Sequence, residues 1–231
     1  MLKRAPWQAL PLLALLLVSG SWANDRPFQY ARTAIEEDDE EVWSFESWAQ
    51  RLGSVRSLSI EPEYAFSTRA SVQVELTRVL DRHDVETGHE AEVEFKYIFN
   101  NIARDGWGLG IGVALSGQRL AGPSTRAIRL ELPLSLPLGE SKGFLHLNVG
   151  LDKASDARLA WTSSVGIEGE VARRTTLFAE LARDGDLKYG QVGARYWLKK
   201  ERLALDFTLQ QQRSDGQRAS GFLVGFGLYD L

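Results

Sequence analysis

The chain has 231 residues, with 27 basic and 31 acidic side chains and a formal net charge of −4. This length fits one domain or at most two small ones, and the mild acidity argues against a nucleic-acid-binding protein. The chain has no cysteine, which excludes a disulfide framework and a thiolate metal site. A mean hydropathy of −0.22 excludes a bundle of transmembrane helices, but it leaves open a membrane barrel, whose strands alternate apolar and polar residues.

The first 23 residues have the pattern of a secretory signal peptide. Two basic residues precede an apolar run from Trp7 to Val18, and Ser21 and Ala23 place small residues where signal peptidase reads them. The alternative is a membrane anchor, but this run is shorter than the ~20 apolar residues that a membrane-spanning helix needs. We therefore expect export with cleavage after Ala23, so that residues 1–23 form no part of the mature fold.

An acidic segment, residues 24–41, follows the signal sequence. Its last six residues, Glu36 to Glu41, are all acidic. Such a run repels itself and buries nothing, so we expect a flexible segment. The functional alternatives are a plug for the domain that follows and an arm that binds a partner.

From Val42 onward the hydrophobic residues recur with a period of two. Residues 91–99 place five apolar side chains on one face and three charged side chains on the other. Residues 128–136 and 203–210 show the same alternation. A strict period of two predicts β-strands rather than helices.

This pattern predicts an antiparallel, up-and-down transmembrane β-barrel over residues 42–231. Many of the predicted strands are long enough to cross a bilayer, which takes ~9–11 residues in a tilted strand. The range 42–50 could also form a short helix, but closed single-chain barrels have even strand numbers, so we expect twelve strands with ten as the fallback. A soluble periplasmic β-sandwich is the alternative fold. The twelve predicted strands are 42–50, 56–66, 70–80, 88–99, 105–116, 126–136, 143–151, 158–170, 174–182, 187–198, 202–212 and 219–231.

Aromatic residues near the predicted strand ends are placed as in the interfacial girdles of membrane barrels. The chain finishes with Tyr229 and Leu231 on one face, an imperfect form of the terminal aromatic signal that barrel-assembly machinery reads. We therefore expect the cell outer membrane as the location, with its lipids and the assembly machinery as partners. The aromatic residues are Tyr64, Phe66, Tyr97, Phe99, Trp107, Trp161, Tyr196, Trp197, Phe226 and Tyr229.

If the apolar face meets lipid, the opposite face lines the lumen and carries more acids than bases. Like charges this close favour cations, so an open pore should prefer cations. The alternative is a closed, ion-paired wall, because twelve strands lie between the filled interior of eight and the open channel of sixteen. The lumen-lining acids are Glu61, Glu63, Glu75, Glu92, Glu94, Glu131, Glu168, Glu180 and Asp206, and the bases are Lys96, Arg129 and Arg195.

No motif for catalysis or for a cofactor is present, so we expect neither. His83 and His89 bracket a predicted loop, but their spacing matches no metal motif. His146 and Asn148 share a strand face, and a lipid hydrolase could use such a histidine with a serine. No motif places a serine, the predicted strand facing turns His146 inward, and nucleophile-elbow, phosphate-loop and zinc-protease motifs are missing.

Residues 57–100 resemble an outer-membrane, channel-like family associated with the MetA pathway of phenol degradation. The resemblance rests on Glu61-Pro62-Glu63-Tyr64-Ala65-Phe66 with Ser67-Thr68-Arg69, and on Phe95-Lys96-Tyr97. Ala65 departs from the glycine that the family tends to have after the tyrosine. The resemblance implies an outer-membrane barrel for small molecules, aromatic ones among them, and it assigns no site residue.

The functional prediction is therefore a narrow passive channel or uptake barrel for small solutes. The second hypothesis is a sealed structural or partner-binding barrel. The third is a lipid-modifying enzyme that acts through His146.

Overall fold

The computed structural model describes residues 27–36, 40–80, 87–119, 124–139, 143–214 and 216–231. The signal-peptide prediction for residues 1–23 lies outside the described residues. The elements are β1 (Val42–Leu52), β2 (Val55–Ser67), β3 (Ala70–Leu80), β4 (Thr87–Ile98), α1 (Ile102–Asp105), β5 (Gly108–Arg119), β6 (Thr125–Pro137), β7 (Gly143–Ala154), β8 (Ala160–Ala172), β9 (Thr175–Asp184), β10 (Leu187–Lys199), β11 (Leu203–Ser214) and β12 (Gln217–Leu228).

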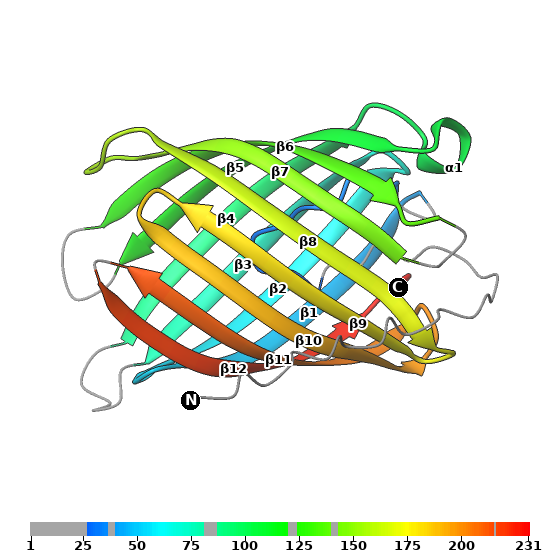
Figure 1. The fold of residues 1–231 in the computed structure, drawn as a ribbon. Coiled ribbons are helices and arrows are strands. Elements are labelled where there is room, and N and C mark those ends of the chain that lie inside the picture. The colour runs from blue at the N-terminus through cyan, green and yellow to red at the C-terminus, as the bar shows by residue number, and fades with distance from the viewer. Residues whose placement is uncertain (1–26, 37–39, 81–86, 120–123, 140–142, 215) are drawn as a thin grey trace, which may run out of the picture.

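The strands form one closed antiparallel barrel in which each strand pairs with its neighbours in the chain (Figure 1). The barrel closes where β1 pairs with β12, from Phe45 opposite Leu228 to Leu52 opposite Gly221. Closure leaves no strand edge with unpaired backbone groups. The predicted twelve-stranded up-and-down barrel is confirmed, and the uncertain range 42–50 is a strand and not a helix.

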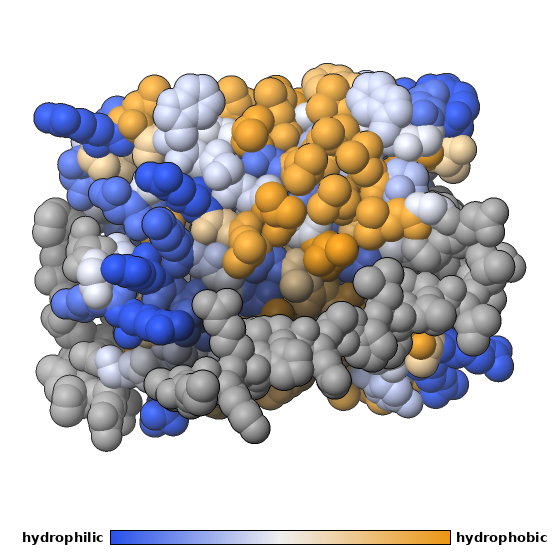
Figure 2. All heavy atoms as spheres, viewed as in Figure 1, coloured by the Kyte–Doolittle hydropathy of each residue, from blue (hydrophilic) through white to orange (hydrophobic). Residues whose placement is uncertain are grey.

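The outward face of the barrel is apolar. Leu115, Val149 and Leu181, for example, are each more than half exposed, and they alternate with inward-facing polar residues. In Figure 2 hydrophobic side chains gather around the middle of the barrel. The strands have 10 to 13 residues, which is enough to cross a bilayer when tilted. None of the described helices is long and apolar enough to cross a membrane.

The structure moves several predicted strand ends. Strand β5 begins at Gly108, because the short helix α1 occupies part of the connection between β4 and β5. The Asn101 side chain caps α1 by accepting a hydrogen bond from the Arg104 N–H. Strand β12 begins at Gln217 and ends at Leu228, so Tyr229 and Leu231 follow the strand and do not belong to it.

Two of the predicted girdle aromatics face inward. Trp197 is 7% exposed and Tyr229 is 3% exposed, and their ring centroids lie 5.7 Å apart. Trp197 shares its strand face with Arg195, and the alternation of strand side chains therefore turns both inward. Phe66, Phe99 and other members of the set are exposed on the outer surface, as a girdle requires.

Candidate functional site

Residues 27–36, called here the lumen segment, lie inside the barrel (Figure 1). They form hydrogen bonds with residues of β4, β6, β7, β9 and β10. Phe28 and Arg32 are 5% and 6% exposed. This differs from the flexible segment that the acidic run predicts, because the continuous run of acids begins only at Glu36, and residues 27–35 include small and apolar side chains. Residues 24–26 and 37–39 lie outside the described residues.

Glu180 on β9 binds the start of the lumen segment. Its carboxylate accepts hydrogen bonds from the N–H groups of Gln29 at 3.0 Å, Tyr30 at 2.8 Å and Ala31. The amide of Gln191 also donates to this carboxylate, at 2.8 Å. Because Glu180 is only 2% exposed, these donors replace the water that a buried carboxylate has lost.

Arg32 lies at the centre of a buried ion-pair cluster. Its Nε is 2.8 Å from Glu94 and 3.7 Å from Glu131, and its Nη2 is 3.5 Å from Glu92. The main chain is bound as well, because Asn148 accepts from the Arg32 N–H at 2.9 Å and donates to its carbonyl at 3.0 Å. The lumen segment thus supplies a cation to an acidic wall.

Further along, the lumen segment meets a line of three hydrogen-bonded side chains. Ser135 Oγ accepts from the Ala34 N–H at 2.7 Å and lies 2.8 Å from His146 Nδ1. His146 Nε2 is 3.3 Å from Glu168. This order of serine, histidine and carboxylate is that of a nucleophile and its base. Ser135 and His146 are both 0% exposed, however, so no described path brings a lipid to the serine.

Two inward-facing glycines make room for the lumen segment. A Cβ on Gly108 would lie 1.7 Å from the carbonyl oxygen of Ala34, which is an overlap with backbone. A Cβ on Gly166 would lie 3.1 Å from the ring of Phe28 and 3.2 Å from the Cβ of Ala31. The wall of β5 and β8 is therefore shaped to the main chain that crosses it.

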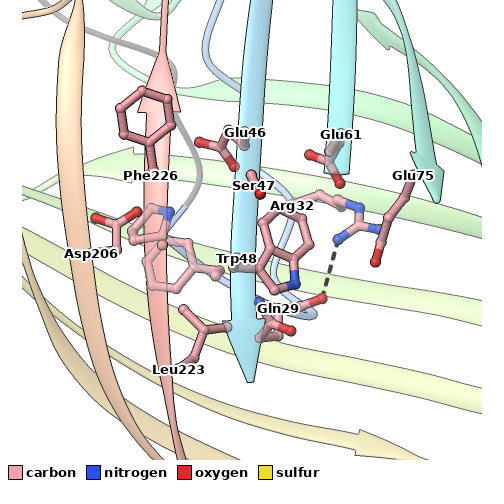
Figure 3. A pocket seen from close by; sticks show the side chains of 13 residues that line it. Gln29, Arg32, Glu46, Ser47, Trp48, Glu61, Glu75, Asp206, Leu223 and Phe226 are labelled. Atoms are coloured by element: carbon pink, nitrogen blue, oxygen red, sulfur yellow. Dashed lines mark hydrogen bonds between the residues drawn. The ribbon is translucent and has the colours of Figure 1, made fainter. Parts of the chain in front are cut away.

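A small acidic cavity remains beside the lumen segment. It has a volume of about 50 Å³ and is lined by Arg32, Glu46, Glu61, Glu75 and Asp206, among other residues. Figure 3 shows Arg32 beside Glu75, with Glu46 on β1 and Asp206 on β11, the two strands that flank β12. Since one water needs roughly 10–15 Å³ on this measure, the cavity holds only a few waters.

The predicted lumen residues fall into separate clusters. Glu61, Glu75, Glu92, Glu94 and Glu131 lie around Arg32 or the cavity beside it. Lys96, 5% exposed, is 3.5 Å from Glu63, which also accepts from the hydroxyl of Ser71 at 2.6 Å.

The other two predicted bases form their own clusters. Arg129 is 3.3 Å from Asp152 and 3.8 Å from Asp184. Arg195 pairs with Asp206 at 2.8 Å and Glu46 at 3.2 Å, and its guanidinium carbon lies 5.5 Å from the Trp197 ring centroid and 5.4 Å from that of Tyr229. The wall is thus ion-paired where the sequence alone left a pore lining and an ion-paired wall both open.

Sequence reasoning missed the central residue, Arg32, and the serine beside His146. The signal for Arg32 was the charge imbalance of the predicted lumen face, which has nine acids and three bases and therefore needs further cations for neutrality. The signal for Ser135 was the strand register, which places it directly opposite His146.

The metal site considered between His83 and His89 falls on a loop that lies mostly outside the described residues, as does His83, and His89 is exposed on the outer face of β4. Within the described part of the chain, no group of three or more His, Asp or Glu side chains is arranged to hold a metal ion.

Neither the known protein families nor the curated proteins contain a match to this sequence. The resemblance to the phenol-degradation family therefore stays a prediction.

Solved structures of outer-membrane barrels are similar in fold. The KdgM porin has a TM-score of 0.65 at 13% identity, over 80% of this chain and 98% of that one. The NanC porin has a TM-score of 0.60 at 7% identity, over 82% and 100% of the two chains. An outer membrane channel from Pseudomonas putida F1 has a TM-score of 0.59 at 12% identity, over 89% and 99%. At these identities the likeness establishes one thing, that the chain has the fold of outer-membrane porin and channel barrels.

Proposed function

We propose that the protein is an outer-membrane channel for small solutes whose path is closed by the lumen segment and opens when that segment moves. The observation that carries this proposal is the position of residues 27–36, which lie inside a charged lumen and form hydrogen bonds with five strands of its wall.

The apolar outer belt and the porin-like fold support the outer membrane as the location, reached by export with the signal peptide removed. The proposed solutes are small, and the protein needs no cofactor for their passage.

We further propose that the open path prefers cations. When the lumen segment leaves, Arg32 leaves with it, and the carboxylates of Glu92, Glu94 and Glu131 face the water-filled path without that cation. A reversal potential that shows anion preference would contradict this.

The test is single-channel recording of refolded residues 24–231 in a planar bilayer. We expect brief, discrete openings from the intact chain, and larger and longer ones after deletion of residues 24–41. A correctly folded barrel that stays silent in both forms would contradict the channel and favour the sealed, partner-binding barrel.

Charge reversal at Glu94 tests the path itself. Glu94→Lys places a second cation beside Arg32, which loosens the lumen segment and removes a carboxylate from the path. We expect longer openings with weaker cation preference. Asp156→Lys, the same charge change in the exposed connection between β7 and β8, is the control and should leave both unchanged. Identical records from the two variants would contradict the placement of Glu94 along the path.

The hydrogen-bonded Ser135 and His146 keep lipid hydrolysis as the competing function. We expect the refolded protein to release no fatty acid from phospholipid vesicles. Hydrolysis that disappears in both Ser135→Ala and His146→Ala would replace the channel proposal with an enzymatic one.

A further inference from the structure

The outer surface of the described strands carries a ring of exposed basic side chains at one end of the barrel. This end, called here the distal end, is opposite the one that holds the start of β1 and the end of β12. Ten strands each place one exposed Arg or Lys there, and β4 places His89. The ten residues, called here the basic ring, are Arg51, Arg56, Arg78, Arg119, Arg126, Lys153, Arg183, Lys188, Arg213 and Arg218.

Strand register places several members of the basic ring directly against one another. Lys188 lies opposite Arg183 on one side and Arg213 on the other, and Arg213 in turn lies opposite Arg218. Arg51 lies opposite Arg56. Like charges directly across two strands destabilise a sheet. An anion bound between these basic side chains would relieve their mutual repulsion.

Within the described strands, no acid shares the outer face with the basic ring. Every Asp and Glu in these strands stands at an inward-facing position of the alternation, as Asp152 and Asp184 do at this end. The exposed acids described at this end, Asp156 and Asp186, lie in connections between strands. Within the described part of the chain, no member of the basic ring forms a salt bridge. In Figure 2 strongly hydrophilic side chains gather at the left end, beside the hydrophobic belt.

An apolar groove next to the basic ring indicates that the bound anion is the headgroup of a lipid. It has a volume of about 610 Å³ and lies on the outer face of β2 to β6. Leu58, Ile60 and Leu76 give it an apolar wall, and Ala91 and Gly117 leave room between the strands. Arg78, His89, Arg119 and Arg126 line the same groove on its distal side.

We propose that the basic ring binds the phosphate groups of anionic lipids in the membrane leaflet at the distal end, and that the groove between β2 and β6 seats the acyl chains of one such lipid. Guanidinium groups match phosphate oxygens in pairs of hydrogen bonds. The apolar wall next to them fits a hydrocarbon chain and not a free ion. The proposal requires a barrel in a bilayer and does not depend on whether solutes pass through the lumen.

The test measures lipid association with the refolded mature chain in phosphatidylcholine vesicles. Spin-labelled phosphatidic acid and spin-labelled phosphatidylcholine are compared by electron paramagnetic resonance. We expect a several-fold preference for phosphatidic acid. The triple variant Arg78→Gln, Arg119→Gln, Arg126→Gln should abolish this preference, since each base near a membrane surface contributes roughly five-fold. Equal association of the two lipids with the wild-type chain would overturn the proposal.

Two controls separate the lipid site from simple charge. The variant Arg173→Gln, Arg174→Gln, Arg202→Gln removes the same charge from the other end of the barrel and should keep the preference. Gly117→Trp fills the groove without changing charge and should weaken association of both lipids at that site. Heat-modifiable gel migration confirms that each variant is folded. Equal losses in the two triple variants, or displacement of the labelled lipid by millimolar inorganic phosphate, would overturn the proposal.

Discussion

Arg32 joins the lumen segment to the acidic wall of the barrel. The residue is 6% exposed, and its guanidinium faces three carboxylates from two strands, Glu92 and Glu94 on β4 and Glu131 on β6. A buried ion pair adds little net stability over apolar packing, but removal of one partner leaves the other charge unpaired and is strongly destabilising. In the proposed closure, Arg32 is therefore the latch that holds the lumen segment to the wall.

Replacing Arg32 with glutamine should release this latch. We expect the free energy of unfolding to fall by up to about 3–5 kcal/mol, because the carboxylates lose their cation. Urea unfolding in lipid vesicles, followed by tryptophan fluorescence, measures the change. Arg104→Gln breaks an exposed pair with Asp105 and should leave the unfolding midpoint where it was. Equal midpoints for wild type and Arg32→Gln would show that the latch has no energetic role.

At the residue scale, the sequence predicted the lumen-facing side chains of the strands better than the segment that lies inside the lumen. The period of two assigned Lys96, Arg129 and Arg195 to a face shared with acids, because side-chain direction in a strand follows from position alone. No such rule applies to residues 27–36, which have no regular secondary structure. Their place in the lumen depends on hydrogen bonds with residues more than 60 positions away, such as Glu94, Asn148 and Glu180.

At the scale of the element, glycines in the strands leave the space that the lumen segment occupies. Gly108 at the start of β5 leaves space that the Ala34 carbonyl fills. We expect Gly108→Ala to displace this part of the lumen segment and to lengthen channel openings in planar bilayers. Gly169→Ala on β8 is the matched control, because its added Cβ meets only the Cα of Gly143 at 4.0 Å. If both variants open like wild type, the glycine gap does not hold the segment closed.

The features that the sequence failed to predict are a short helix and the ends of strands. Helix α1 has four residues, too few for a helical period to show. Trp197 and Tyr229 sit near strand ends as girdle residues do, but their orientation depends on strand parity and on where β12 stops. The long strands were predictable because alternation over nine or more residues has one physical explanation, a sheet that is apolar on one face and polar on the other.

At the scale of the whole molecule, the barrel closes without the lumen segment. Strand β1 pairs with β12 and with β2 along its length, and residues 27–36 take no part in this pairing. We therefore expect the chain without residues 24–41 to keep heat-modifiable migration in gels, with a faster band before heating than after. A deletion variant that migrates as unfolded without heating would show that the segment is needed for the barrel and is not a separable closure.

Locking the lumen segment in place is the most direct test of its role. The chain has no cysteine, so the pair Ala31→Cys and Gly166→Cys can form only one intramolecular disulfide. The two Cβ positions lie 3.2 Å apart, a few tenths of an ångström closer than the usual separation of ~3.8 Å in a disulfide. Single-channel recording then compares the oxidised and the reduced forms of the same protein. The proposed closure predicts a silent oxidised form that opens after reduction, and openings of equal size and frequency in both forms would contradict it.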